Sequence, residues 1–566
     1  MKYYFVDNLF EKRNALLKSD AAKPFIDDVI KKADIAIEKP VSSAKFSDFM
    51  IFFESGSRSE YEKGYFAKRN DCMYILSAYF LTNNHKYLTP LIDYINYICD
   101  EFTWCVPAHC DVHKFSTREI VERVDLFQSE TVRLFSEIIM LMGNNLPSYV
   151  KERMKYEVER RVFRPIRDLE TFQGPTFYWE NMTNNWSAVC GAGVTLGMMC
   201  FMEDREIKTF VPRITGWMDN YLEGISDDGC CEEGISYWGY GFFHFVLLAD
   251  IIKKYTKGKI NYFEKEKVKN LALFNQRMIL SESECVSFSD SREEFQFKIG
   301  LISHLKSIYP EIYRPSLKYG TICGNVHSTA EILWFDERYR EDELHEEIVY
   351  YRDPQLFVSR QNSYSFAAKG GHNAEPHNHN DMGSFIITKG DKIILNDLGA
   401  GKYTKDYFIP DTRYNYLVTG SQGHSVPIIN GTYQLPGKDR SAKNVSHSDK
   451  HFEVELQDAY KEGIIERIHR NFVLNDDSIV LTDTFIYSDK TESVTERFVS
   501  KTKPELKDGC ITINDASLYF DKEKYLLTVT ETSIKSHIGD IDVPVYLIDF
   551  EFTDKSIREF KLEIRL

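Results

Sequence analysis

The spacing of apolar residues divides the chain into two parts. From the start to about residue 335, apolar residues recur every three to four positions, as in residues 71–102, where Thr82-Asn83-Asn84 breaks the pattern into a helix, a turn and a helix. Similar helical stretches occupy residues 125–142, 151–169, 187–202 and 240–254. Amphipathic helices without intervening strands predict helical hairpins arranged in a ring or solenoid.

Beyond about residue 341 the apolar period becomes two. Residues 452–456, 478–487 and 493–499 alternate apolar with polar side chains, and turn signals such as Asn475-Asp476-Asp477 separate them. This pattern predicts antiparallel strands. We therefore expect two domains, a helical one over residues 1–340 and an antiparallel β domain over residues 341–566.

Composition narrows the class of protein. Hydrophobic residues make up 43% and charged residues 28%, which is ordinary for a globular protein, and the net charge of -16 argues against a general nucleic-acid binder. No apolar run approaches the length of a membrane span. The first eight residues lack the apolar core of a signal peptide, and the 11 cysteines are scattered, so we expect a cytoplasmic protein with reduced thiols. The oligomeric state stays open, with a homodimer as one option.

The segment 370–381 concentrates ionisable side chains. It holds His372, His377, His379 and Asp381 just before an apolar strand-like run. In a His-x-His pair on an extended segment both rings point the same way, so two nitrogens can meet one metal or one substrate. The alternative is a solvent-exposed His-rich loop without a binding function.

Two further motifs lie in the helical part. Asn184-Asn185-Trp186 opens a helix, and the Gly-rich stretch 228–240 carries Tyr237 and Tyr240. The alternative is a purely structural role, in which Asn185 caps the helix and the aromatic residues pack in the core.

These motifs, together with His377-Asn378-His379-Asn380-Asp381, Asp397-Leu398-Gly399 and His424, resemble the heparinase II/III-like polysaccharide lyases in order and spacing across most of the chain. The resemblance implies an incomplete (α/α) toroid followed by an antiparallel β-sandwich domain. It also implies cleavage of uronic-acid polysaccharides by β-elimination.

The resemblance also assigns catalytic roles. Removing the proton on carbon five of a uronate builds charge on the adjacent carboxylate, which hydrogen-bond donors can stabilise, here Asn185 and His377. One tyrosine can serve as base and then as acid. Tyr237 and Tyr240 lie three residues apart and face one side of a helix; the spacing from Asn185 favours Tyr240.

A metal is expected at His379, Asp397 and His424, which match positions where the family often binds zinc. Two imidazoles and a carboxylate are suitable zinc ligands, and the role would be structural, holding the loop that presents His377. The rival reading is hydrolysis by a metal-bound water. No organic cofactor is expected.

The substrate contacts expected are Trp186, His372, Arg413 and Glu233. Trp186 stands where many family members carry His, which makes it a candidate sugar platform. His372 and Arg413 would meet carboxylate or sulfate groups. Glu233 would hold the Gly-rich turn or orient a tyrosine.

The expected function is a lyase acting on acidic poly- or oligosaccharides, with glycosaminoglycans ahead of alginate. The alternatives are an alginate oligosaccharide lyase, a uronosyl epimerase and a non-catalytic carbohydrate-binding protein. Only a lyase creates a double bond in its product.

Overall fold

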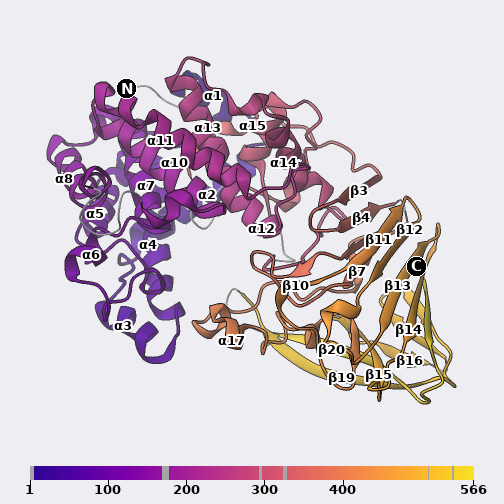
Figure 1. Ribbon diagram of the computed structural model, residues 1–566. Helices are drawn as coiled ribbons and strands as arrows, with labels where there is room; N and C mark the ends of the chain where they lie inside the picture. Colours follow the sequence, from indigo (N-terminus) through magenta and orange to yellow (C-terminus); the bar gives the residue numbers. More distant parts are fainter. Residues whose placement is uncertain are drawn as a thin grey trace. The chain divides into compact units, whose positions relative to one another are not determined.

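The computed structural model describes residues 6–168, 177–291, 296–322, 328–361, 363–507, 509–537 and 541–566. It divides into two compact units (Figure 1). The helical unit consists of Met1–Ile225, Gly239–Ala272 and Gln296–Asp342. The β unit consists of Ser226–Trp238, Leu273–Phe295 and Glu343–Leu566.

The helical unit is built from helices that pack against one another, both sequence neighbours and helices farther apart along the chain. Helix α14 (Glu266–Arg277) begins in this unit and ends in the β unit. The other helices of the unit are α1 (Leu9–Leu17), α2 (Lys23–Glu38), α3 (Phe46–Ser55), α4 (Ser59–Thr82), α5 (Leu88–Cys99), α6 (Thr117–Val121), α7 (Leu126–Met142), α8 (Ser148–Val158), α9 (Arg164–Arg167), α10 (Asn185–Phe201), α11 (Asp204–Glu223), α13 (Phe243–Tyr255), α15 (Ile299–Ile308) and α16 (Ala330–Trp334). Two short strands, β1 (Phe297–Lys298) and β2 (Gly320–Thr321), pair in parallel.

The centre of this unit is the α7–α10 pair. Small residues on α10 let the two backbones approach closely: a Cβ on Gly193 would lie 2.1 Å from the Ser129 carbonyl oxygen, and one on Gly197 would lie 2.3 Å from Val132. Asp125 starts α7 by accepting a hydrogen bond from the Gln128 amide at 2.8 Å. The predicted helices are thus confirmed, although the last residue of the stretch 151–169 lies outside the described residues.

One apolar segment is long enough to cross a membrane by length and composition. It is Ile235–Tyr255, and 83% of its apolar window is buried inside the protein. The sequence-based expectation of no such run is therefore wrong for this segment. A core helix passes the same test, and this burial is what a core helix shows.

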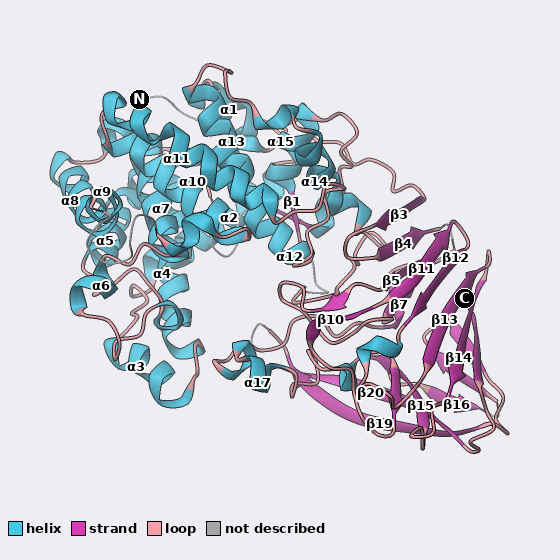
Figure 2. Cartoon of the chain, viewed as in Figure 1, coloured by secondary structure: helices cyan, strands magenta, loops and turns pink. Residues whose placement is uncertain are grey.

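Every strand pairing among the described residues of the β unit is antiparallel. Figure 2 shows these strands in magenta. Its strands are β3 (Glu347–Tyr351), β4 (Leu356–Arg360), β5 (Ser365–Lys369), β6 (His372–Asn373), β7 (Phe385–Lys389), β8 (Lys392–Leu395), β9 (Pro427–Ile429), β10 (Gly437–Ser441), β11 (Lys443–Ser448), β12 (His451–Glu455), β13 (Arg467–Leu474), β14 (Ser478–Ile486), β15 (Val494–Ser500), β16 (Glu505–Lys507), β17 (Cys510–Ile513), β18 (Ala516–Tyr519), β19 (Tyr525–Lys535), β20 (Asp542–Phe552) and β21 (Glu559–Arg565). Two short helices, α12 (Ile235–Tyr237) and α17 (Pro410–Arg413), belong to this unit.

Three sheets share one hydrophobic core. Their strand orders are β3-β4-β5-β7-β8, β11-β12-β13-β14-β21-β18-β17-β16 and β19-β20-β15-β9. Strands β4 and β5 are buried along their whole length, because both faces of their sheet are covered. Strands β13 and β14 alternate buried with more exposed residues. Phe366 lies 4.9 Å from Phe472, ring centroid to ring centroid, which ties the first two sheets together.

The domain boundary predicted at residues 340 and 341 is close to the observed one at 342 and 343, but the division is incomplete. Ser226–Trp238 and Leu273–Phe295 precede that boundary and yet pack with the β unit. Apolar periodicity reports which local structure a segment forms and carries no information about which core it joins. The correction matters because both segments carry site residues.

Candidate functional site

The His377–His379 loop connects β6 to β7 and is not an extended strand. His377 adopts a left-handed conformation with φ of 56°, which is uncommon outside glycine and concentrates at functional sites. The expectation of an extended His-x-His segment is therefore wrong. The two imidazoles nevertheless converge, and their common partner is a carboxylate.

That carboxylate is Asp290, from the segment Leu273–Phe295. His377 Nδ1 lies 2.7 Å from Asp290 Oδ2, and His379 Nε2 lies 3.0 Å from Asp290 Oδ1. The Tyr407 hydroxyl also donates to Asp290. Burial alone would raise the pKa of Asp290, but the hydrogen bonds from both histidines outweigh it and hold this pKa well below its usual range. Asp290 therefore stays ionised and fixes both rings.

Arg413 was expected to meet substrate, and the structure contradicts this. Its buried guanidinium donates to the carbonyl oxygens of Asn378 and Tyr407 and to Asp290. All three guanidinium nitrogens are engaged inside the protein. Arg413 holds the His377–His379 loop in place instead.

The face of His377 is covered by Tyr237. Their ring centroids are 4.0 Å apart with an interplanar angle of 30°. The Tyr237 hydroxyl lies 3.0 Å from the hydroxyl of Tyr403. Glu233 Oε2 lies 3.6 Å from His377 Nε2, so Glu233 and Tyr237, both from Ser226–Trp238, flank the same imidazole. Burial raises the pKa of Tyr403 well above its ordinary value, so Tyr403 remains a proton donor.

His379, Asp397 and His424 form a fully buried triad whose ligand atoms lie within 4.8 Å of one another. Asp397 is oriented by the Gly399 amide, which donates to its Oδ1 at 2.9 Å. Gly399 has φ of 61°, and a Cβ there would lie 2.4 Å from the Ser291 carbonyl oxygen, so this turn requires glycine.

The donor set of this triad fits a metal ion. His424 Nε2 lies 3.0 Å from the Val418 carbonyl oxygen and must donate to it, which leaves Nδ1 facing Asp397 Oδ2 at 2.9 Å. Two acceptors at that distance need a proton or a metal ion between them. His379 donates through Nε2 to Asp290, and its Nδ1 is buried with no hydrogen-bond partner among the described residues. Imidazoles that give their second N–H to a carboxylate or carbonyl are typical metal ligands.

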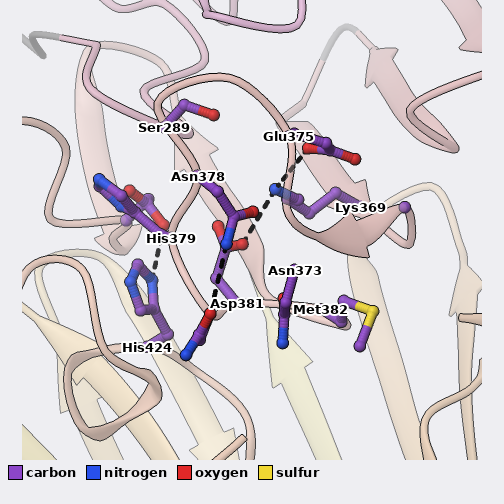
Figure 3. A network of polar contacts seen from close by, with 12 residues as sticks. Ser289, Lys369, Asn373, Glu375, Asn378, His379, Asp381, Met382 and His424 are labelled. Carbon is purple, nitrogen blue, oxygen red and sulfur yellow. Dashed lines mark hydrogen bonds and ion pairs between the residues drawn. The ribbon is translucent and has the colours of Figure 1, made fainter. Parts of the chain in front are cut away.

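Two further buried cations hold the ends of the loop. Lys369 Nζ, at the end of β5, lies 2.9 Å from Asp381 Oδ1 and 3.4 Å from Glu375 Oε2 (Figure 3). Burial lowers the pKa of Lys369, but the charges of Asp381 and Glu375 outweigh it and raise that pKa above its ordinary value.

Arg470 provides the second of these supports. It is fully buried and donates to the carbonyl oxygens of Gly383, at the end of the loop, and Ser425, next to His424. Figure 3 shows His379 and His424 on neighbouring segments, and their ring centroids are 5.4 Å apart. The loop is thus anchored from its start to its end.

His372 lies on β6, which pairs with β10. Its Nδ1 accepts a hydrogen bond from the Ala374 amide at 3.2 Å, so the imidazole contacts the backbone that directly follows it. Its proposed substrate contact stays a prediction.

Asn185 and Tyr240 belong to the helical unit. Asn184, and not Asn185, caps α10 by accepting from the Trp186 amide. The interpretation of Asn185 as the helix N-cap is therefore excluded. Asn185 is 5% exposed, and a Cβ on Gly241 would lie 3.0 Å from its own Cβ.

Tyr240 forms a hydrogen bond with an acid. Its hydroxyl donates to Glu130 Oε1 at 2.6 Å. Burial, reinforced by the charge of Glu130, raises the pKa of Tyr240 well above its ordinary value. Burial also raises the pKa of Glu130 to about 7. Tyr240 is therefore held in its protonated form.

Residues 355–533 match the sequence profile described as heparinase II/III-like, C-terminal. The matched segment, which is less than half of this chain, is similar to the C-terminal domain of the heparinase II/III-like family. The match covers most of the β unit, including the His377–His379 loop and the buried triad. Among curated proteins, none matches the sequence.

Solved structures resemble this chain in fold along most of its length. A mutant of the heparan sulfate lyase HepC from Pedobacter heparinus is 12% identical, with a TM-score of 0.62 over 95% of this chain and 82% of that one. Heparinase III is 14% identical, with a TM-score of 0.63 over 90% and 77%. A chondroitin AC lyase mutant from Streptomyces coelicolor A3 is 8% identical, with a TM-score of 0.53 over 99% and 83%. The predicted architecture, an (α/α) toroid domain followed by an antiparallel β-sandwich domain, is confirmed.

The sequence alone did not identify Asp290, Tyr403 and Tyr407. Asp290 is separated from His377 by 87 residues, and no motif surrounds it. The only local signal is the stretch Ser287-Phe288-Ser289-Asp290-Ser291, whose small polar residues indicate a turn. The tyrosines are common residues in an aromatic-rich chain and carry no signal of their own.

Proposed function

We propose that this protein is a polysaccharide lyase that cleaves uronic-acid-containing glycans by β-elimination. The family match and the fold support a polysaccharide lyase. The observation that carries the proposal is the arrangement around His377: a left-handed backbone, an imidazole held by ionised Asp290, and a tyrosine stacked on its face. Glycosaminoglycans are the favoured substrates, because the relatives in fold are named for heparan sulfate and chondroitin.

His377 is proposed to stabilise the uronate carboxylate. His377 Nδ1 donates to Asp290, which fixes the ring and makes Nε2, 3.6 Å from Glu233 Oε2, the nitrogen that meets substrate. Nε2 acts as a donor when the imidazole carries both protons. A donor aimed at a carboxylate that gains charge in the transition state lowers the barrier by a few kcal/mol. By resemblance Asn185 has the same role, and its side chain is not consumed by the helix cap.

Tyr237 is proposed as the base that removes the carbon-five proton and then, as an acid, returns a proton to the departing glycosidic oxygen. Its hydroxyl lies beside Tyr403, which stays protonated and can donate to a tyrosinate, and its ring lies on His377. The sequence spacing favours Tyr240, but the hydroxyl of Tyr240 faces Glu130, whose negative charge opposes ionisation. We therefore move the base assignment to Tyr237.

His379, Asp397 and His424 are proposed to hold one zinc ion through two imidazole nitrogens and a carboxylate oxygen. The ion would join the turns that carry these three residues and so hold the loop that presents His377. Its contribution is structural, and the proton transfers proposed above use only the chain's own residues.

We also propose that the protein is cytoplasmic and acts on oligosaccharides. In the described part of the chain, ten cysteines are free thiols and eight of them are buried, as suits a reducing compartment. Thiol titration of the freshly purified, unfolded protein tests this: oxidised cysteines would contradict it.

The test of the function is a panel of heparan sulfate, chondroitin, hyaluronan and alginate oligosaccharides, followed by ultraviolet absorbance of the unsaturated product. Reaction in heavy-oxygen water should leave the product unlabelled, because elimination adds no water. Label at the cleaved linkage would show hydrolysis instead. Tyr237→Phe should abolish turnover while folding and binding survive; loss only in Tyr240→Phe would return the role to Tyr240.

A further inference from the structure

The helical unit contains a row of adjacent, half-buried aromatic and basic side chains near the start of α10. We call it the Arg123 cluster; its members are Phe115, Arg123, Tyr178, Trp186 and His109. The Arg123 guanidinium carbon lies 4.5 Å from the ring centroid of Phe115 and 5.1 Å from that of Tyr178. Cations over aromatic faces at these distances are attracted to the rings.

The cluster continues from Tyr178 through Trp186 to His109. Ring centroids of Tyr178 and Trp186 are 5.5 Å apart, and those of Trp186 and His109 are 4.9 Å apart. His109 is held by Asp125, whose fully buried Oδ2 lies 2.7 Å from His109 Nδ1. Because Asp125 also caps α7, the imidazole is anchored to the rigid centre of the unit.

Arg123 differs in its partners from other arginines of this unit. Arg69 binds Glu101, and Arg161 binds Glu157. For Arg123 no hydrogen bond or ion pair is recorded with any residue in the described part of the chain, and its Nε is buried without a partner. Glu119, which is half-buried, interacts with it only through space. A partly buried cation without an anion is costly, and a ligand anion would remove that cost.

We propose that the Arg123 cluster is a binding subsite for an acidic sugar residue. The guanidinium donates to the carboxylate or sulfate group, for which its planar fork is suited. The half-buried rings of Trp186 and Tyr178 supply flat apolar faces on which the sugar ring lies. The proposal rests on the proposed substrate class and adds where an acidic group of that substrate binds.

The experiment measures binding by calorimetry with the full chain carrying Tyr237→Phe and Tyr240→Phe, which suppresses turnover. The probes are a hyaluronan tetrasaccharide, whose only acidic groups are carboxylates, and a heparan sulfate tetrasaccharide. Arg123→Gln should weaken binding about tenfold to a hundredfold. Loss with both probes identifies carboxylate as the ligand, and loss with heparan sulfate alone identifies sulfate. Arg153→Gln, which removes an arginine already paired with Asp100, is the control and should bind normally.

A packing role makes the opposite prediction. If Arg123 only fills space between rings, Arg123→Gln lowers the melting temperature and leaves both dissociation constants unchanged, which overturns the proposal. Arg123→Lys keeps the positive charge but lacks the planar guanidinium. It should therefore weaken oligosaccharide binding less than Arg123→Gln does. If the unsubstituted protein forms no unsaturated product and Arg123→Gln still weakens binding, the subsite stands and the lyase proposal fails.

Discussion

Lys369→Met should destabilise the β unit by about 3–5 kcal/mol. Lys369 is the cation between the buried carboxylates of Asp381 and Glu375, at 2.9 and 3.4 Å. With an effective dielectric constant of about 20, each pair is worth roughly 5 kcal/mol of Coulomb attraction, much of it offset by desolvation. Methionine fills a similar volume but leaves two buried carboxylates without a counter-charge.

The same change should disturb the site, because Glu375 and Asp381 bracket the segment that carries His377 and His379. Turnover should fall together with the unfolding free energy. Urea denaturation followed by circular dichroism measures the stability, and the unsaturated-product assay measures the turnover.

Lys392→Met is the matched control. Lys392 pairs with Asp515 at 2.5 Å, but both side chains are more than half exposed, and such surface pairs contribute about 0–1 kcal/mol. The reasoning is refuted if Lys369→Met unfolds within 1 kcal/mol of the unsubstituted protein, or if the two variants lose equal stability.

Three further predictions concern the same protein. Asp290→Asn should lower metal affinity or turnover about tenfold to a hundredfold, since one carboxylate orients both His377 and His379; unchanged metal content and kinetics would contradict this. His379→Ala should lower the zinc content, measured by mass spectrometry, and the melting temperature, because metal-binding energy is then part of folding energy; a metal-free unsubstituted protein would end the zinc proposal. Burial raises the pKa of Glu331 to about 7, so its contribution to stability is fully present below its unfolded pKa of about 4.5 and is lost as the pH rises through 7. Glu331→Gln should therefore be more stable by up to about 3 kcal/mol above pH 7 and equal below pH 4, measured by urea denaturation across pH; parallel profiles would refute it.

The sequence by itself determined the local structure and the motifs. Apolar spacing placed α5, α7 and α10 within a few residues of their observed ends and found the end of α4, although α4 begins at Ser59, well before the predicted start at residue 71. It succeeds because helical and strand periods depend only on near neighbours along the chain. The three residues of the buried triad were also found from sequence, because they resemble a known family pattern.

Only the tertiary structure decided which segments meet. It brought Asp290 and Tyr237, from stretches that precede the β domain in sequence, to His377, and it turned Arg413 inwards to the loop. These contacts join residues tens to more than a hundred positions apart, and no local pattern encodes such pairings. They arise because buried charges must find partners and buried rings must pack, conditions set by the whole folded unit.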